Sequence, residues 1–283
     1  MAPAPVWGKR RLPYTGRDVV QIISVDQRAR EQRGVTICLA GVPGVGKTSQ
    51  VRTLRDRLPK AIMIDCEAGG LAIADVSIDT IHGPSWQELC DIGLILGGPD
   101  SVQAPSEPYS QARYNALIAK PEYARLAAYD TIFIDSLTEV SRRSFAFAER
   151  QPEAFSHGCK DLRGAYGLHA RQMVSWLSRL QRGRTRNVIM TCVLERTVDN
   201  LGTATWELQI EGARTGRELP AIIDELIIMN FVDFGDGKPV RAFITAQPNP
   251  WNYPSKDRSG RLDLYERPDL GALLDKLLIT DGG

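Results

Sequence analysis

Residues 35–48 read VTICLAGVPGVGKT, and this stretch decides the fold of the chain. Its first part, 35–40, is a short apolar run with β-branched residues, a pattern that predicts a buried strand. Gly41–Thr48 then match the pattern G-x-x-x-x-G-K-S/T at every position, and a helical stretch follows over 49–57. Because strand, glycine-rich loop and helix come in that order, we predict a phosphate-binding loop rather than an ordinary glycine-rich turn.

The chemistry of such a loop explains its residue types. Glycines allow backbone torsions and a close approach that a Cβ would block, so successive N–H groups can surround an anion. The following helix adds positive potential. We expect Lys47 to reach the β- and γ-phosphates as a catalytic residue, and the Thr48 hydroxyl to ligate Mg²⁺. The predicted nucleotide-binding residues are Gly41, Val42, Pro43, Gly44, Val45, Gly46, Lys47, Thr48 and Ser49.

The sequence around this loop alternates between strands and helices. Further apolar runs of strand length occur at 61–65, 77–81, 131–135 and 187–193, with little polar alternation, which is typical of parallel strands covered on both faces. Helical stretches at 85–96, 112–127, 137–150 and 160–181 separate them and indicate an α/β fold. Beyond residue 193, the runs 206–210, 225–232 and 240–245 predict a mostly antiparallel extension of the same sheet.

The N-terminal segment differs in composition from the rest. Residues 1–17 contain three prolines, two glycines and the basic cluster Lys9–Arg11, so we predict a flexible arm. Residues 18–33 predict a helix that Gly34 ends. The expected organisation is therefore an arm over 1–17 and a single domain over 18–283.

Composition excludes several classes of protein. A hydrophobic fraction of 43% in 283 residues allows a sizeable core and excludes intrinsic disorder. No apolar run approaches the length of a membrane helix, and no secretory signal is present, so we expect no membrane association. The five cysteines form no C-x-x-C pair, which fits a reducing cytoplasm. A net charge of +1 means that any nucleic-acid binding needs a local basic patch.

Two acidic residues lie at or just after the ends of predicted strands and are candidates for binding Mg²⁺ and for activating water. Asp135 ends the run 131–135, and the carboxyl ends of parallel strands meet at one edge of a sheet, so we predict that it holds Mg²⁺. Capping of the next helix is a role that the same residue can also play. Many P-loop ATPases place a glutamate that activates water directly after this aspartate. Here Ser136 stands at that position, so the residue that activates water must come from elsewhere. Glu67, just past the strand 61–65, is one candidate, because we expect that strand beside the P-loop strand; a solvated surface carboxylate is the alternative.

These residues resemble those of the RecA-like ATPases. IMIDCE (62–67) looks like the strand segment that carries their catalytic glutamate. More specifically, the chain is similar to the phage nucleotide-binding family of RecA-like recombinases, the "Sak-four" type. The similarity rests on GVPGVGKTS, IDCEAGG, FIDSLTEVSR, NVIMTCVLER, EGARTGRELPAIIDEL and YPSKDRSGRLDLYERPDL, in the family's order over roughly residues 34–275.

The resemblance implies a RecA-like fold and specific roles. Glu67 would be the general base, with Glu139 as the alternative. Glu139 can also be explained as an acidic residue in the first turn of a helix, where the helix dipole favours negative charge. Thr191, at the end of the fifth strand, matches a catalytic residue that senses the γ-phosphate. Lys256 and Arg258 resemble a basic pair that contacts nucleotide, in cis or across a subunit interface; a solvated turn is the alternative.

The resemblance also implies partners. We expect ATP and Mg²⁺ as cofactors, a homo-oligomer bound to single-stranded DNA, and a phage single-strand binding protein as a further partner, in the cytoplasm of a bacterial host. The segments expected to contact DNA are Gln151–Gly167 and Glu195–Arg217, which combine basic and aromatic residues. The function is then ATP hydrolysis in DNA recombination or single-strand annealing, stimulated by the DNA. The alternatives are an ATPase or nucleotide switch that acts on a protein without DNA, and a small-molecule kinase.

Overall fold

The structure is a computed structural model, and it describes residues 23–25, 33–183, 185–198, 202 and 204–278. Gln32–Ile279 form one compact unit, whereas Met1–Glu31 and Thr280–Gly283 belong to a second. The single domain predicted over 18–283 stays a prediction. The predicted arm over 1–17, and most of the helix predicted over 18–33, lie outside the described residues.

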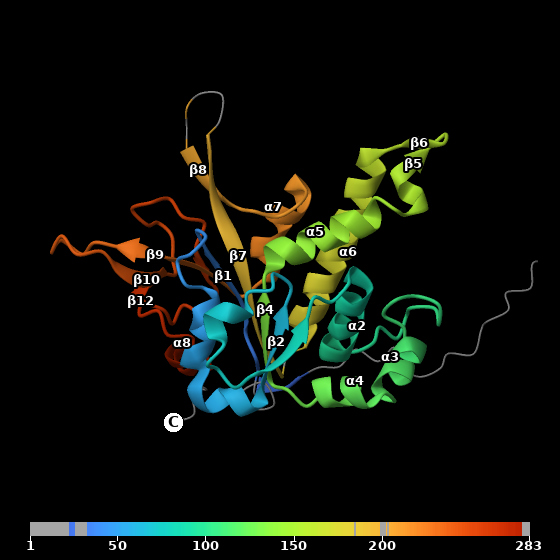
Figure 1. Cartoon of the computed structure of the whole chain (residues 1–283), viewed down its shortest axis with the longest axis horizontal. Helices are drawn as coiled ribbons and strands as arrows, with labels where there is room; N and C mark the ends of the chain where they lie inside the picture. The colour runs from blue at the N-terminus through green and yellow to red at the C-terminus, as the bar shows by residue number, and fades with distance from the viewer. Residues whose placement is uncertain (1–22, 26–32, 184, 199–201, 203, 279–283) are drawn as a thin grey trace, which may run out of the picture. The chain divides into compact units, whose positions relative to one another are not determined.

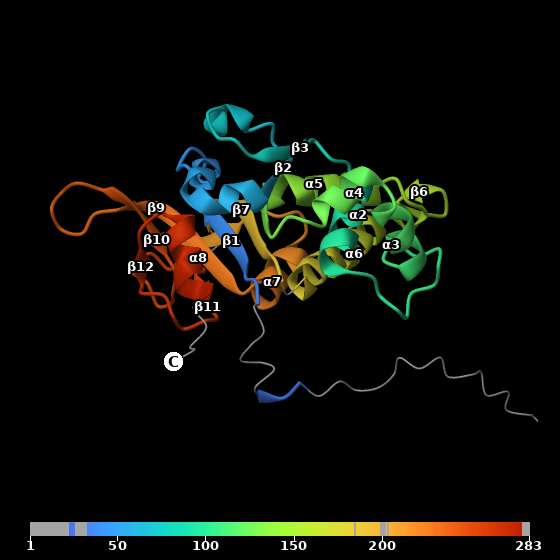
Figure 2. The ribbon, with the colours of Figure 1, turned by 90° about the horizontal axis from the view of Figure 1, so that it is seen from below.

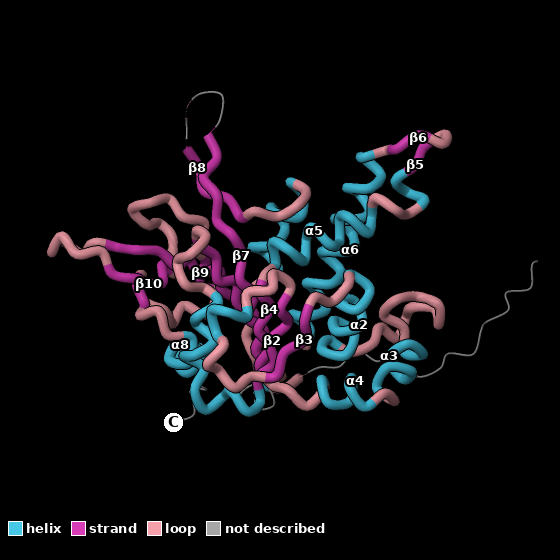
Figure 3. Tube along the Cα trace, viewed as in Figure 1, coloured by secondary structure: helices cyan, strands magenta, loops and turns pink. Residues whose placement is uncertain are grey.

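A mostly parallel sheet forms the centre of the compact unit (Figures 1 and 3). Its strands follow the order β12-β10-β9-β1-β7-β4-β2-β3. The segment from β9 to β3 is parallel. β1, β2 and β4 are buried along their whole length, as expected for strands covered on both faces, whereas β3 at the edge is polar and partly exposed. The parallel strands are β1 (Thr36–Gly41), β2 (Ala61–Asp65), β3 (Asp79–His82), β4 (Thr131–Asp135), β7 (Asn187–Val198) and β9 (Glu225–Val232).

Antiparallel strands extend the sheet toward the C-terminus. β10 pairs with β9 and β12 with β10, while β11 pairs with the start of β9 and β8 with the end of β7. The predicted architecture, an α/β domain with a mostly parallel sheet flanked by helices and an antiparallel C-terminal extension, is confirmed. The bounds are β8 (Ala204–Leu208), β10 (Val240–Ile244), β11 (Lys256–Asp257) and β12 (Tyr265–Glu266). A separate hairpin consists of β5 (Phe155–Ser156) and β6 (Cys159–Lys160).

Helices cover both faces of the sheet and enclose two cores. On one face, α2, α5 and α6 bury the large side chains of one cluster, among them Trp176 and Leu89. On the other face, the P-loop helix η1 and α8 bury a second cluster around Leu54 and Leu274. Figures 1 and 2 show α8 and the α2–α6 group on either side of the central strands. The bounds are η1 (Thr48–Lys60), η2 (Gly70–Ile73), α2 (Trp86–Gly97), α3 (Gln111–Ile118), α4 (Pro121–Leu126), α5 (Leu137–Ala148), η3 (Pro152–Ala154), α6 (Leu162–Arg182), α7 (Ala213–Ile222) and α8 (Leu270–Leu278).

Local signals explain where several helices start and stop. The Ser85 hydroxyl accepts from the Glu88 backbone N–H, while the Glu88 carboxylate accepts from Ser85, so a capping box begins α2. The stretch predicted as one helix over 112–127 divides into α3 and α4, because Pro121 starts a new helix at its first turn. The helix predicted over 49–57 is 3-10 helical, extends to Lys60 and is interrupted by a kink at Arg55, where φ is 49°.

Two expectations about the arrangement were wrong. The strand 61–65 does not lie beside the P-loop strand: β7 and β4 separate β2 from β1. The run 225–232 was expected in an antiparallel extension, but β9 pairs with β1 in parallel. Both errors concern which strands pair across long sequence separations, which a local pattern does not encode. Within the described residues, no helix is long and apolar enough to cross a membrane.

Candidate nucleotide-binding site

The P-loop leaves β1 at the carboxyl edge of the sheet and turns sharply into η1. At Gly41 an added Cβ would lie 2.6 Å from the Met229 carbonyl oxygen, so β9 leaves no room for a side chain. Gly44 and Gly46 have φ values of 77° and 103°, which favour glycine. The glycines that the motif requires are therefore explained by close packing at one position and by backbone torsion at two others.

The loop offers donors for an anion. Within the described part of the chain, the backbone N–H groups of Gly46 and Lys47 donate to no protein acceptor. The Lys47 ammonium donates to the carbonyl oxygens of Gly41 and Val42 at 2.8 and 3.1 Å. Burial lowers the pKa of Lys47, while the carboxylates of Asp135 and Glu67 act in the opposite direction. A phosphate group in the cradle could replace these two carbonyl acceptors of Lys47 with anionic oxygens, so that both partners of the bond are charged.

The predicted metal ligands lie in contact. The Thr48 hydroxyl donates to Asp135 Oδ2 at 2.7 Å, although 87 residues separate the two in sequence. The Thr191 hydroxyl, from the neighbouring strand β7, donates to the other carboxylate oxygen. Burial raises the pKa of Asp135, and the bonds from Thr191 and Thr48 offset part of that rise. Two hydroxyls therefore hold this buried carboxylate in a fixed orientation.

This donor set fits a magnesium ion. Mg²⁺ prefers hard oxygen ligands and usually keeps several waters, so one hydroxyl and one carboxylate beside a phosphate cradle are the expected protein contribution. Thr48 and Asp135 would hold the ion, and when bound it would neutralise charge on the phosphate oxygens. Thr191, predicted as a sensor of the γ-phosphate, here orients Asp135; its role as a sensor stays a prediction.

Glu67 belongs to a turn that packs against Thr48 and Asp135. The turn follows β2, whose last residue, Asp65, is buried and accepts hydrogen bonds from the backbone N–H groups of Glu67 and Gly69. A Cβ at Gly69 would lie 3.3 Å from Asp135 Oδ2, so the turn packs directly on the metal-side carboxylate. The exposed Glu67 side chain accepts a hydrogen bond from the Ser136 hydroxyl. The structure thus brings Glu67, Asp135 and Lys47 to one edge of the sheet.

The alternative base, Glu139, has different neighbours. Its carboxylate lies 3.4 Å from the Arg143 guanidinium and 3.7 Å from that of Arg142. The Arg143 guanidinium also donates to the carbonyl oxygens of Cys66 and Pro84 and so ties α5 to the turn that carries Glu67. Glu139 is thus held between two guanidinium groups, an arrangement that suits the positioning of Arg143.

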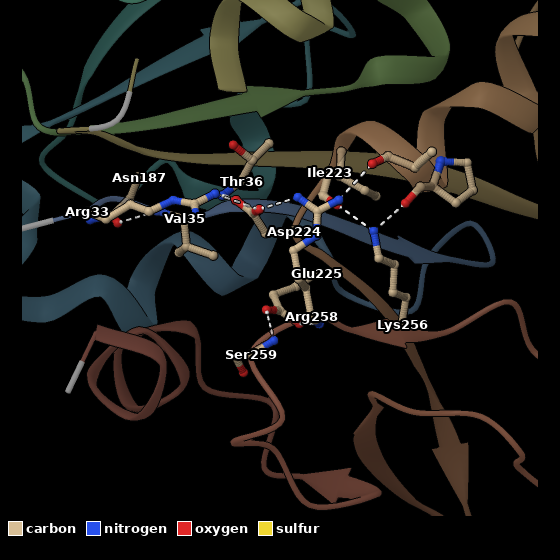
Figure 4. A network of polar contacts seen from close by, with 12 residues as sticks. Arg33, Val35, Thr36, Asn187, Ile223, Asp224, Glu225, Lys256, Arg258 and Ser259 are labelled. Atoms are coloured by element: carbon tan, nitrogen blue, oxygen red, sulfur yellow. Dashed lines mark hydrogen bonds and ion pairs between the residues drawn. The ribbon is translucent and has the colours of Figure 1, made fainter. Parts of the chain in front are cut away.

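Lys256 and Arg258 do not line the cradle of their own chain, so that prediction was wrong in cis. β11 pairs with Leu226 and Glu225 at the start of β9, which is the edge of the sheet opposite the P-loop. The Lys256 ammonium donates to the carbonyl oxygens of Pro220 and Ile223, where α7 ends. The Arg258 guanidinium pairs with Asp224 at 2.8 Å (Figure 4). These contacts stabilise the junction of α7 with β9; contact across a subunit interface stays a prediction.

Sequence reasoning missed three residues that the structure places here. Asp65 anchors the Glu67 turn, and an aspartate two residues before the acid was a signal that could have indicated this. Ser136 was noted only because it is not a glutamate, yet it both caps α5 and holds Glu67. Arg241 approaches Gly46 from β10. Nothing in the local sequence of Arg241 predicts that contact, because it depends on how β10 pairs.

Comparisons with known proteins agree with this geometry. The profile of the AAA_24 family, an AAA domain, matches residues 33–259, which is most of the chain. The chain belongs to this family. As a family member it is a P-loop NTPase domain, and the cradle, Thr48 and Asp135 lie within the matched range.

Similar solved structures and curated proteins add little further detail. A crystal structure of the RadB recombinase has a TM-score of 0.32 and 14% identity, covering 75% of this chain and 80% of that one. The Legionella pneumophila ATPase DotB has a TM-score of 0.28 and 13% identity, covering 76% of this chain and 46% of that one. No curated protein matches.

Proposed function

We propose that this AAA-domain protein hydrolyses ATP with Mg²⁺ and acts on single-stranded DNA, as a RecA-like, phage-type protein of recombination or strand annealing. Thr48 and Asp135 hold the metal, and Glu67 accepts the proton of the attacking water. The DNA contact is assigned to the segment 151–167. A homo-oligomer on the strand, and a phage single-strand binding protein as partner, complete the proposal.

The observation that carries the DNA assignment is a group of exposed aromatic and basic side chains. Phe155, on the β5–β6 hairpin, is 50% exposed, and Tyr166, in the first turns of α6, is 41% exposed. The Tyr166 ring stacks on Phe145 with centroids 4.4 Å apart, which holds it in place. Arg163 lies nearby in sequence and is exposed, and so is Lys160, whose ammonium pairs with the Glu149 carboxylate at 2.7 Å. Aromatic faces with neighbouring cations can stack on bases and pair with phosphates.

The second segment predicted to contact DNA, Glu195–Arg217, has fewer exposed groups that could bind it. Its aromatic residue, Trp206, packs on Tyr253 with ring centroids 5.2 Å apart and is partly buried. Arg214 pairs with Glu218 at 2.7 Å within α7. Each segment holds a cation that is already paired, so the exposed aromatic rings of the first segment decide the assignment of the principal DNA contact to 151–167.

One helix connects that segment to the proposed catalytic residues. Ser136, which holds Glu67, is also the N-cap of α5, and α5 ends at Ala148 just before η3 and the β5–β6 hairpin. Figure 1 shows this hairpin at the far ends of α5 and α6. DNA that moves the hairpin would act on the position of Glu67 through α5, which supports hydrolysis stimulated by DNA.

The alternatives receive less support. A kinase needs a lid with free arginines, and the Arg113 guanidinium, in the segment 97–120, bonds Asp91 at 2.7 and 2.8 Å. An ATPase of the extended AAA class that acts mechanically on a protein needs a C-terminal helical lid. The described residues after β10 contain the single helix α8, which packs on η1.

The test measures phosphate release with and without a homopolymeric single strand at two salt concentrations. We expect stimulation that weakens at higher salt, because phosphate contacts release counterions. Phe155→Ala should weaken DNA binding by about tenfold, within the roughly 1–3 kcal/mol that one stacked base contributes. Phe234→Ala is the matched control, since Phe234 is a phenylalanine of similar exposure, 58%, on another hairpin. Equal rates with and without DNA would contradict the proposal.

A further inference from the structure

The β9–β10 hairpin extends beyond the P-loop strand. Ala40 of β1 pairs with Ile228 of β9, after which β1 turns into the P-loop while β9 continues to Val232. β10 then returns, with Arg241 directly opposite Phe231. Figures 1 and 3 show the hairpin projecting from the sheet. The part of the hairpin nearest the sheet, around Phe231 and Arg241, therefore lies beside the phosphate-binding loop; we call it the hairpin wall.

Arg241 and Phe231 lie on the face of the hairpin wall that the P-loop occupies. Ile227 and Met229 pack in the same core as Val45 of the P-loop, and side chains of a strand alternate with period two. Phe231 is therefore on that face as well, and Arg241 is its cross-strand partner.

The guanidinium of Arg241 packs against the loop itself. A Cβ at Gly46 would lie 3.5 Å from both Cζ and one terminal nitrogen of Arg241. The same guanidinium lies 5.4 Å from the centroid of the Phe231 ring, which supports it from beneath. Among the described residues, no carboxylate pairs with it. An exposed guanidinium without an anionic partner therefore lies next to backbone N–H groups that lack acceptors.

Arg241 is on the opposite side of the P-loop strand from the proposed catalytic acids. Asp135 and Glu67 follow β4 and β2, which lie on one side of β1, whereas β9 and β10 lie on the other. A group that contacts the phosphate to be released belongs on the side of the acids. A cation on the side of β9 can instead meet the part of the nucleotide nearer the sugar.

We propose that Arg241 is a nucleotide-binding residue that pairs with the phosphates shared by ADP and ATP, with Phe231 holding its guanidinium. The proposal rests on nucleotide binding in the cradle, as the proposed function does. A planar guanidinium fits phosphate oxygens with paired hydrogen bonds, which an ammonium does not reproduce. Because the contact does not involve the terminal phosphate, its loss should affect ADP and ATP equally.

The test measures the dissociation constants of ADP and ATP by isothermal titration calorimetry. Arg241→Ala should raise both constants by about tenfold, in the range expected for a charge-assisted hydrogen bond, and Arg241→Lys should give an intermediate value. Lys238→Ala is the matched control, because Lys238 is an exposed cation on the same hairpin, and it should change neither constant by more than about twofold. The rise of the melting temperature on adding ADP gives a second readout that does not depend on turnover.

Each result decides a separate point. If Arg241→Ala binds ADP as tightly as Lys238→Ala does, Arg241 does not contact the nucleotide and the inference is wrong while the proposed function stands. A loss confined to ATP would place Arg241 at the terminal phosphate and also overturn the inference. If the unmodified protein binds neither nucleotide, both proposals fail. The melting temperature without nucleotide shows whether a variant is folded.

Discussion

The buried carboxyl group of Glu225 gives a prediction that the structure allows to be worked out in numbers. Glu225 begins β9 and is 1% exposed. Burial raises its pKa from 4.5 to about 8, and the nearby Asp257 carboxylate contributes to the rise; backbone N–H groups of Arg258 and Ser259 offset a part (Figure 4). At physiological pH this group is therefore largely protonated in the folded chain and ionised in the unfolded chain.

The sign of the pH dependence follows from those two pKa values. Between pH 4.5 and about 8 the folded state binds the proton and the unfolded state does not, so the free energy of unfolding falls as pH rises through this window. Since one pKa unit corresponds to about 1.36 kcal/mol, the shift amounts to at most roughly 5 kcal/mol. Glu225→Gln has the same shape and cannot ionise, so it should lack this loss.

The assay is urea unfolding followed by tryptophan fluorescence at pH 5, 7 and 9. Relative to the unmodified protein, Glu225→Gln should become steadily more stable as pH rises, by up to about 4 kcal/mol between pH 5 and 9, because part of the shift falls below pH 5. Glu207→Gln, at an exposed position on β8, is the control and should leave the profile unchanged. Parallel pH profiles for Glu225→Gln and the unmodified protein would refute the reasoning, because the carboxyl group would then titrate normally in the fold.

Two further predictions concern the candidate site. Glu67→Gln should lower steady-state phosphate release by about 10²–10⁴-fold and leave ATP affinity unchanged, as measured by calorimetry; unchanged turnover would shift the general-base role to Glu139, whose own glutamine variant is the comparison. Thr191→Val removes the hydroxyl that orients Asp135, so the Mg²⁺ concentration for half-maximal turnover should rise by about tenfold or more, and a normal Mg²⁺ titration would argue that Thr48 alone fixes the carboxylate.

Residues close in sequence made much of the site predictable. The P-loop and the strand that ends at Asp135 each carry their signal within a few positions, and Thr48 and Asp135 do meet. Glu67 reached the same edge although the expected position of its strand was wrong. The carboxyl ends of all parallel strands meet at that edge whatever their order, which is why the prediction survived the error.

Features set by distant pairing were not predictable in the same way. Lys256 is one of a basic pair, but only the pairing of β11 with the start of β9 places it at the opposite edge from the P-loop. Arg241 depends on the pairing of β10 with β9. No helix is predicted from the sequence at α7, whose Gly216 and Pro220 have low helix propensity; packing of Leu219 in the core overrides that weak preference.

The length of β7 has a mechanical consequence. Its buried half carries Thr191, which holds Asp135, and its outer half forms an exposed ribbon with β8 that reaches Val198 (Figure 1). The two residues are about 23 Å apart along one extended backbone, at roughly 3.3 Å per residue. A force applied to β7 at Val198 is therefore transmitted along one extended strand to Thr191, which orients the Asp135 carboxylate. Such a force should change the rate of ATP hydrolysis.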